Sequence, residues 1–322
     1  MTYPAYPLRT LTEEEIETFR RDGVVMVKGL LQDNWLALLE VGLEEARSSA
    51  SLIGKGMSAN SPGYEMDAYL WKRVDAIRDL IYYSPCARWA QQLMGSEEVR
   101  FFYDQMFVKE PGTDTPTPWH HDLTFWPLEG NQICSFWIPL DPVTRANSGL
   151  QYVKGSHLWQ KRFKAISPDY NASLIDPTME DVPDINAHPD KYETTSWDME
   201  PGDVLMFHPL TLHGASGNTS RDRRRRALAL RWTGDDVRYA PTETVLPIPY
   251  RHNSKPGGPL SGGAFPRILP EHIPAERALR ATGPELMNGA VVGKKAWQSF
   301  RGSFMRRLRG ASKSEQEMEQ TW

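Results

Sequence analysis

The stretch PWHHD, residues 118–122, places two side chains of metal-ligand type two positions apart. In an extended strand, residues i and i+2 point to the same face, so His120 and Asp122 are predicted to bind one ion while His121 faces away. A third ligand must come from elsewhere in the chain, and His213 is the candidate. Two imidazoles and one carboxylate form the facial triad of non-haem Fe(II) oxygenases, which leaves three coordination positions open.

These assignments have competitors, because the chain contains eight histidines. His121 competes with His120, but only His120 has an acid two positions further on. His208 competes with His213, and we prefer His213 because the Gly214 that follows it suits a sharp turn. The remaining histidines are interpreted as structural or surface residues: His157, His188, His252 and His272.

Length and composition limit the classes of protein to which the chain can belong. Apolar residues make up 40% and charged residues 24% of the 322 positions, which predicts a folded chain with a large core. The net charge of -4 gives no reason to expect a nucleic-acid partner. Only two cysteines occur, so we expect no disulfide framework and a reducing, cytoplasmic location. No secretory signal pattern and no apolar run of ~20 residues is seen, so no membrane span is expected.

The N-terminal part, residues 1–95, is predicted to be mainly helical. Thr12 and Glu15 have the spacing of a capping box, and Gly23 is placed to end the helix that follows. Pro85 divides a later helical stretch in two. The predicted elements are, in order, a helix at 12–23, a strand at 24–29, a helix at 33–50, a loop at 51–64 and two helices within 70–94.

After Gly95 the pattern becomes that of strands, and residues 96–250 are predicted to form a sandwich or jelly roll because several short strands are separated by Gly and Pro turns. The predicted strands are 99–108, the one that holds His120, 133–140, 149–153, 204–207 and 227–232. Residues 161–197 carry four prolines and many acids without strong periodicity, which indicates a lid over the barrel mouth.

The C-terminal tail, residues 293–322, differs in character from the rest. It has large apolar residues at helical spacing with lysines and arginines around them, the pattern of a basic amphipathic helix. Such a helix can lie on an anionic surface, but we favour docking on its own barrel or on a partner subunit. A homo-oligomer formed through this tail is therefore one possible assembly.

Several motifs, taken together and in order, resemble the phytanoyl-CoA dioxygenase family of Fe(II)- and 2-oxoglutarate-dependent oxygenases. They are residues 11–15, 119–122, 148–150 with 155–157, and 201–203 leading to 208–214. The resemblance implies a mainly β fold with flanking helices, in which a double-stranded β-helix (jelly roll, cupin-like) core holds the metal between two sheets and residues 1–292 form a single dioxygenase domain. It also implies that His120, Asp122 and His213 bind Fe(II), with 2-oxoglutarate and dioxygen as cosubstrates. Halogenases of similar sequence replace the carboxylate with a small residue, whereas this chain keeps Asp122.

The family also uses an arginine, roughly a dozen residues after the second histidine, whose planar fork holds the far carboxylate of 2-oxoglutarate. Four arginines are consecutive here, at 223–226. If Ala227 and Ala229 face the crowded interior, strand alternation puts Arg225 on their side. We therefore predict Arg225, with Arg224 second in case the preceding loop is one residue longer than usual.

Gln105 and Trp137 align with positions that line the cosubstrate pocket in the family. The family serine after the second histidine is Ala215 here, with Ser216 beside it. The predicted substrate contacts are Tyr103, Trp126 and Arg231, which suggest an anionic or partly aromatic small molecule. The resemblance implies hydroxylation of a C–H bond with release of succinate and carbon dioxide. Desaturation, epimerisation or ring formation with the same cofactors, and a non-catalytic metal-binding jelly roll that acts as a sensor, are the alternatives.

Overall fold

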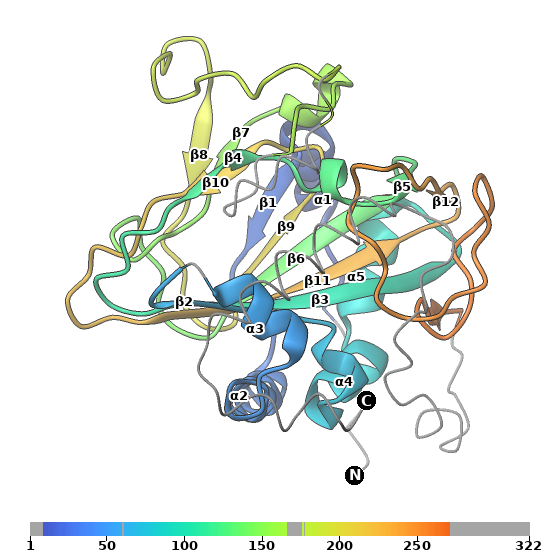
Figure 1. The fold of residues 1–322 in the computed structure, drawn as a ribbon, viewed down its shortest axis with the longest axis horizontal. Coiled ribbons are helices and arrows are strands. Elements are labelled where there is room, and N and C mark those ends of the chain that lie inside the picture. Colours follow the sequence, from blue (N-terminus) through green and yellow to red (C-terminus); the bar gives the residue numbers. More distant parts are fainter. Residues whose placement is uncertain (1–8, 60, 166–175, 177, 271–322) are drawn as a thin grey trace, which may run out of the picture.

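A seven-stranded antiparallel sheet is the larger of two layers in the computed structural model, which describes residues 9–59, 61–165, 176 and 178–270 (Figure 1). Its strands lie in the order β1-β9-β6-β11-β3-β13, and β2 also pairs with β3. The strand bounds are β1 (Val24–Val27), β2 (Tyr64–Ala68), β3 (Val99–Lys109), β6 (Ile133–Pro139), β9 (Val204–Phe207), β11 (Arg225–Thr233) and β13 (Arg267–Leu269).

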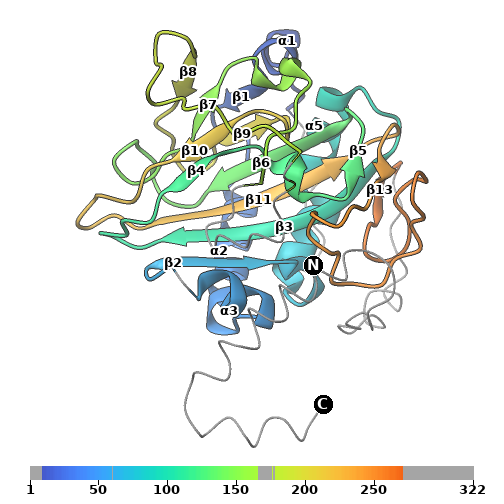
Figure 2. The ribbon, with the colours of Figure 1, turned by 45° about the horizontal axis from the view of Figure 1, so that its top comes forward.

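A four-stranded antiparallel sheet, in the order β4-β10-β7-β8, forms the second layer and lies over the larger sheet (Figure 2). Its strands are β4 (Thr117–His120), β7 (Gln151–Val153), β8 (Thr194–Ser196) and β10 (His213–Ala215), and β5 (Leu128–Glu129) pairs separately with β12 (Arg238–Tyr239). Tyr152 of the smaller sheet packs with Trp137 and Phe207 of the larger one, so the two inner faces share a core. The predicted jelly-roll core is confirmed.

The helices α1, α2, α4 and α5 pack on the outer face of the larger sheet, whereas α3 packs beside β2. Along β11, Leu228, Leu230 and Trp232 pack with the helices, whereas Ala227 and Ala229 face the smaller sheet, as a period of two requires. The helices are α1 (Glu13–Asp22), α2 (Asp33–Ser48), α3 (Leu52–Ser58), α4 (Asp75–Tyr83) and α5 (Cys86–Met94), with 3₁₀ turns η1 (Leu70–Lys72), η2 (Asp122–Phe125) and η3 (Ser156–Trp159).

The start of α1 has the capping box that the sequence predicted. The Glu15 backbone N–H donates to Thr12 Oγ1 at 3.2 Å, and the Thr12 N–H donates to Glu15 Oε2 at 2.9 Å. Gly23 ends the helix with a φ of 77°, a left-handed conformation that glycine adopts without steric cost. Pro85 lies between α4 and α5, as expected.

The prediction of a loop over 51–64 was wrong in part, because α3 lies within it. Its glycines lower the helix propensity of this stretch, but tertiary contacts outweigh that preference. Ser51 caps the helix by accepting from the Gly54 N–H at 3.0 Å, and the buried Asp67 carboxylate accepts from both the N–H and the hydroxyl of Ser51.

Other boundaries also differ from the predictions. The larger sheet takes β1, β2 and β13 from outside residues 96–250, because strand partners far apart in sequence leave no local pattern. Within residues 161–197, the strand β8 pairs with β7, and a role of this stretch as a lid stays a prediction. The tail at 293–322 lies outside the described residues. In the part of the chain that the structure describes, no helix is long and apolar enough to cross a membrane.

Candidate metal centre

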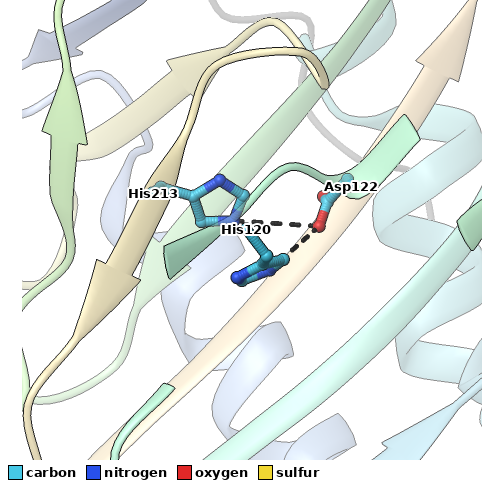
Figure 3. A group of neighbouring side chains, drawn as sticks. All are labelled: His120, Asp122 and His213. Carbon is cyan, nitrogen blue, oxygen red and sulfur yellow. Dashed lines mark ion pairs between the residues drawn. The ribbon is translucent and has the colours of Figure 1, made fainter. Parts of the chain in front are cut away.

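Strand pairing brings the three predicted ligands together (Figure 3). The strands β4 and β10 are neighbours, and His120 lies directly opposite His213 in their register. Asp122 is the first residue of η2 rather than part of a strand, but His121 before it stays extended with φ -125° and ψ 145°. His120 and Asp122 therefore still point to the same side. One ligand atom from each of the three residues can be chosen so that all lie within 4.8 Å of one another.

Hydrogen bonds turn both imidazoles so that Nε2 faces the carboxylate. The Nδ1 atom of His120 lies 2.8 Å from Pro118 O, and that of His213 lies 2.9 Å from Thr211 O. Because a carbonyl oxygen only accepts, each Nδ1 carries a proton and each neutral ring keeps a lone pair on Nε2. These Nε2 atoms lie 3.5 and 3.7 Å from Asp122 Oδ1, while Asp122 Oδ2 is buried without a hydrogen-bond partner among the described residues.

The electrostatics of the group suit a divalent cation. Burial, with His120 nearby, lowers the pKa of His213 to about 4, so its ring is neutral and able to bind a metal at neutral pH. Burial alone would raise the pKa of Asp122. The hydrogen bond with His120 and the proximity of His213 and Arg231 outweigh burial and hold that pKa well below its ordinary value. Two neutral nitrogens and one anionic oxygen fit Fe(II).

The competing histidines have other partners. His121 points away and contacts Thr124 Oγ1 at 2.5 Å, and its Nε2 lies 3.0 Å from the Phe163 N–H. His208 Nε2 lies 3.2 Å from Asn131 O, and the backbone N–H of Leu210 donates to its Nδ1. Both residues are buried, and neither belongs to the group that could hold a metal ion.

The prediction that Gly214 makes a sharp turn after His213 was wrong. Gly214 lies within β10 and makes no sharp turn. A Cβ at this position would lie 3.0 Å from Thr117 O and 3.3 Å from Trp119 N, both on the neighbouring strand β4. The glycine is needed because the two strands approach closely, and that approach is what brings His213 to His120.

The arginine run divides between the inside and the outside of the larger sheet. Arg225 is only 2% exposed and its guanidinium lies 5.6 Å from the centre of the Trp137 ring. Arg224 points outward, where its side chain is 42% exposed and pairs with Glu110 at 2.9 Å. Arg226 also faces outward and pairs with Asp141. The inward position of Arg225 matches the expected alternation, and its role toward 2-oxoglutarate stays a prediction.

The other predicted site residues gather beside Asp122. Arg231 is 3% exposed, donates from Nη2 to Gln105 Oε1 at 3.1 Å, and lies 3.9 Å from Asp122 Oδ2. Its guanidinium lies over the rings of Tyr103, at 4.3 Å, and Trp126, at 5.7 Å. Among the described residues, its Nε and Nη1 have no hydrogen-bond partner. The two aromatic rings thus contact the arginine and leave part of it available to a ligand.

Sequence reasoning missed Lys109, which is buried and pairs in register with Arg225. A signal was available, because strand alternation puts Tyr103, Gln105 and Lys109 on one face of β3. A lysine is seldom fully buried, so the residue type alone did not mark Lys109 as a site residue.

Solved structures share this fold. The non-heme alpha ketoglutarate dependent carbocyclase SnoK from nogalamycin biosynthesis superposes with a TM-score of 0.63 at 24% identity, over 80% of this chain and 96% of that one. The epimerase SnoN, solved in complex with Fe3+, alpha ketoglutarate and nogalamycin RO, gives 0.62 at 23% identity, over 80% and 98%. The fold is therefore shared with these proteins, and the His-Asp-His group supplies three side chains that could hold a metal ion.

Sequence comparison gives the family. The model of the phytanoyl-CoA dioxygenase family matches residues 19–227. A probable phytanoyl-CoA dioxygenase of Caenorhabditis elegans is 30% identical over 142 residues, which are 39% of each chain. Dioxygenase FrzG of Cladobotryum sp is 24% identical over 245 residues, 68% of this chain and 73% of that protein. The chain belongs to the phytanoyl-CoA dioxygenase family, and the expected alternative of a non-catalytic sensor is set aside.

Proposed function

We propose that the protein hydroxylates a C–H bond of a small molecule, with conversion of 2-oxoglutarate to succinate and carbon dioxide. The observation that supports this most directly is the group formed by His120, Asp122 and His213, in which both Nε2 lone pairs and the carboxylate face a common point. Bound iron with 2-oxoglutarate would supply the oxidising power for attack on the C–H bond. Because Asp122 is retained, one coordination position stays filled by protein.

The inward-facing residues of the larger sheet are proposed to place the cosubstrate. Arg225 would bind its far carboxylate with two parallel hydrogen bonds, and Trp137 would pack against its chain. Gln105 holds Arg231 close to Asp122 and would line the end of the pocket nearest to the metal. Arg224 is a poorer candidate than Arg225 because it is exposed and already paired with Glu110.

The proposed function is tested by the release of succinate from 2-oxoglutarate with added Fe(II). Asp122→Ala should abolish this turnover and weaken metal binding, because it removes the anionic ligand. Asp190→Ala is a matched control, since Asp190 is exposed and lies outside the group. Succinate release that survives in Asp122→Ala, or is absent from the wild type, would contradict the proposal.

The substrate is proposed to carry an anionic group that Arg231 binds. The free Nε and Nη1 atoms of this buried arginine lie among Tyr103 and Trp126, close to the metal ligands. Arg231→Leu should raise the KM for such a substrate about ten- to a hundredfold, because a charge-assisted hydrogen bond to a buried group is lost. An unchanged KM would count against an anionic substrate.

A second candidate is a different outcome with the same cofactors, namely desaturation, epimerisation or ring formation. The observation that favours it is that the fold is shared with a carbocyclase and an epimerase. Mass analysis of the product separates these outcomes, because hydroxylation adds an oxygen atom, desaturation and ring formation each remove two hydrogens, and epimerisation leaves the mass unchanged.

We also propose a cytoplasmic location. Cys86 and Cys134 are both free and buried, and burial raises the pKa of the Cys86 thiol to about 12, so neither cysteine depends on an oxidising compartment. Cell fractionation followed by detection of the native chain tests this, and recovery outside the cytoplasm would contradict it.

A further inference from the structure

Lys109, the last residue of β3, is a fully buried cation whose contacts are all with neutral groups. Its Nζ donates to Thr117 Oγ1 at 3.3 Å, Ser148 Oγ at 3.0 Å and Ser216 O at 3.0 Å, and lies 4.7 Å from the centre of the Tyr64 ring. No ion pair joins Lys109 to a carboxylate of the described residues. A buried lysine is rarely left without an anionic partner, because taking its charge out of water is costly.

A second buried cation lies directly across the strand pair. Lys109 and Arg225 are opposite each other in the β3–β11 register, so their side chains leave the same face of the sheet. Arg225 has a hydrogen bond with Tyr64 and likewise makes no ion pair among the described residues, and its Nε is buried without a partner. The nearest acid to influence Arg225 is Asp141, which is itself paired with Arg226. This part of the interior therefore holds two basic side chains, and no acid of the described residues forms an ion pair with either of them.

The contacts of Lys109 also show where Lys109 and Arg225 lie in the fold. Thr117 begins β4, the strand that ends at His120, and Ser216 directly follows β10, the strand that begins at His213. The lysine thus crosses from the larger sheet to the two strands that carry the metal ligands. It lies in the interior between the sheets, on the side of Arg225.

We propose that Lys109 is a second cation for the far carboxylate of 2-oxoglutarate, which it binds together with Arg225. This inference rests on the proposed role of Arg225 in cosubstrate binding. It gives the two basic side chains a shared anionic partner and accounts for a lysine at a buried position that an apolar residue could fill. The competing interpretation is that Lys109 only ties the two sheets together through its three hydrogen bonds.

The protonation of Lys109 offers a signature that a structural tie would lack. Burial, with the charge of Arg225, lowers the pKa of Lys109 to about 6. The charged and titratable groups that face it are Arg225 from β11 and Tyr64 from β2, whereas its contacts in β4, at Ser148 and after β10 are uncharged. An incoming carboxylate favours the ammonium form, so binding should take up a proton above pH 6. The affinity for 2-oxoglutarate should then fall as the pH rises from 6 to 8.

The decisive experiment compares two ligands of equal chain length on the Fe(II)-loaded protein without oxygen, by calorimetry. One is 2-oxoglutarate, and the other is 2-oxopentanoate, in which a methyl group replaces the far carboxylate. Lys109→Met should weaken 2-oxoglutarate about ten- to a hundredfold, the range for loss of a charge-assisted hydrogen bond, and should leave 2-oxopentanoate within about twofold. Lys109→Arg, which keeps the charge, should retain most of the preference for 2-oxoglutarate.

Lys72→Met is the matched control, because Lys72 is also partly buried and burial lowers its pKa to about 8, but its Nζ donates to Gly263 O away from the site. It should change neither affinity. Since the readout is a ratio of two affinities on one variant, a partial loss of folded protein does not imitate the expected result. Equal weakening of both ligands by Lys109→Met, or no weakening of either, would overturn the inference.

The wild-type protein provides an independent measurement if Lys109→Met does not fold. Calorimetry at pH 7.5 in buffers of different ionisation enthalpy should show proton uptake with 2-oxoglutarate and none with 2-oxopentanoate. Equal proton uptake for both ligands would overturn the inference while leaving the proposed function intact. A wild-type protein that binds no 2-oxoglutarate would instead overturn the proposed function, and this inference with it.

Discussion

Arg225 and Arg224 are adjacent residues in very different environments. Arg225 is enclosed near Trp137 and Tyr64, whereas Arg224 reaches the surface and pairs with Glu110. Arg225 begins β11 with its side chain on the inner face, whereas Arg224 precedes the strand and the next residue, Arg226, faces outward as strand alternation requires. Any role in binding a buried carboxylate therefore belongs to the first of the two.

For these two arginines the prediction concerns the affinity for 2-oxoglutarate. Arg225→Leu should raise the KM for 2-oxoglutarate by about ten- to a hundredfold, because the far carboxylate loses a bidentate partner. Arg224→Leu should change it by less than about threefold, since an exposed ion pair contributes little. Steady-state succinate release at varied 2-oxoglutarate measures both. If Arg224→Leu raises the KM for 2-oxoglutarate more than Arg225→Leu does, then Arg224 rather than Arg225 binds the far carboxylate.

The residues of the metal group were accessible from sequence because short-range geometry fixes two of them. His120 and Asp122 are two positions apart in extended chain, so a period of two sufficed even though the strand ends at His120. The contact of Arg231 with Asp122 was not accessible, because it depends on how far the two sheets lie apart. The distance between two sheets cannot be predicted from the pattern of neighbouring residues in the sequence.

Among the elements, β10 is the one whose position the site depends on most directly. Gly214→Ala should push β10 away from β4, since the new Cβ would lie 3.0 Å from Thr117 O. We expect about 1–3 kcal/mol of lost stability, as for other overpacked sites, together with a fall in metal affinity because His213 moves away from His120. Thermal unfolding and titration with Fe(II) measure the two effects separately.

Gly42→Ala is a control for that prediction. Its Cβ would lie 2.7 Å from Ile77 Cδ1, between α2 and α4 and far from the metal group, so it should lower stability without changing metal affinity. If both variants leave metal affinity unchanged, the close approach of β4 and β10 is not what positions His213.

The elements that sequence missed share a physical cause. The helix α3 contains glycines of low helix propensity, and its N-cap Ser51 is held by Asp67, which is 16 residues further along the chain. The strand β8 has exposed ends and no apolar alternation, and it exists because β7 offers it a partner. The elements that were predicted, such as α1 and β11, carry their signal in their own residues.

For the whole molecule, the open question is whether copies of the chain associate. The basic stretch 293–322 lies outside the described residues, and its apolar residues at helical spacing remain a candidate contact. If the tail joins two copies, deletion of residues 293–322 should reduce the mass measured by light scattering from that of a dimer to that of a monomer. Trp297→Ser with Phe304→Ser in the full chain should do the same, and Lys294→Gln with Lys295→Gln should not. A mass that deletion leaves unchanged would contradict this.

The larger architecture also supports the treatment of residues 1–292 as one unit, which stays a prediction. Helical residues from α1, α2, α4 and α5 share a continuous core with β3, β6, β9 and β11, so the described N-terminal part has no separate core of its own. The helices fill the outer side of the sheet whose inner side carries the arginines.

The histidines of the candidate metal group and the buried basic residues lie on different sheets. His120 and His213 lie on the four-stranded sheet, and Lys109 and Arg225 lie on the seven-stranded sheet. A keto acid that contacts both sets of residues must match the distance between the two sheets. Trp137, Tyr152 and Phe207 pack together between the two sheets, and Tyr152 and Phe207 have no proposed contact with the acid. If Arg225 and Lys109 bind the far carboxylate, the packing between the sheets should select dicarboxylates by their length, and larger or smaller side chains at Tyr152 or Phe207 should change that preference.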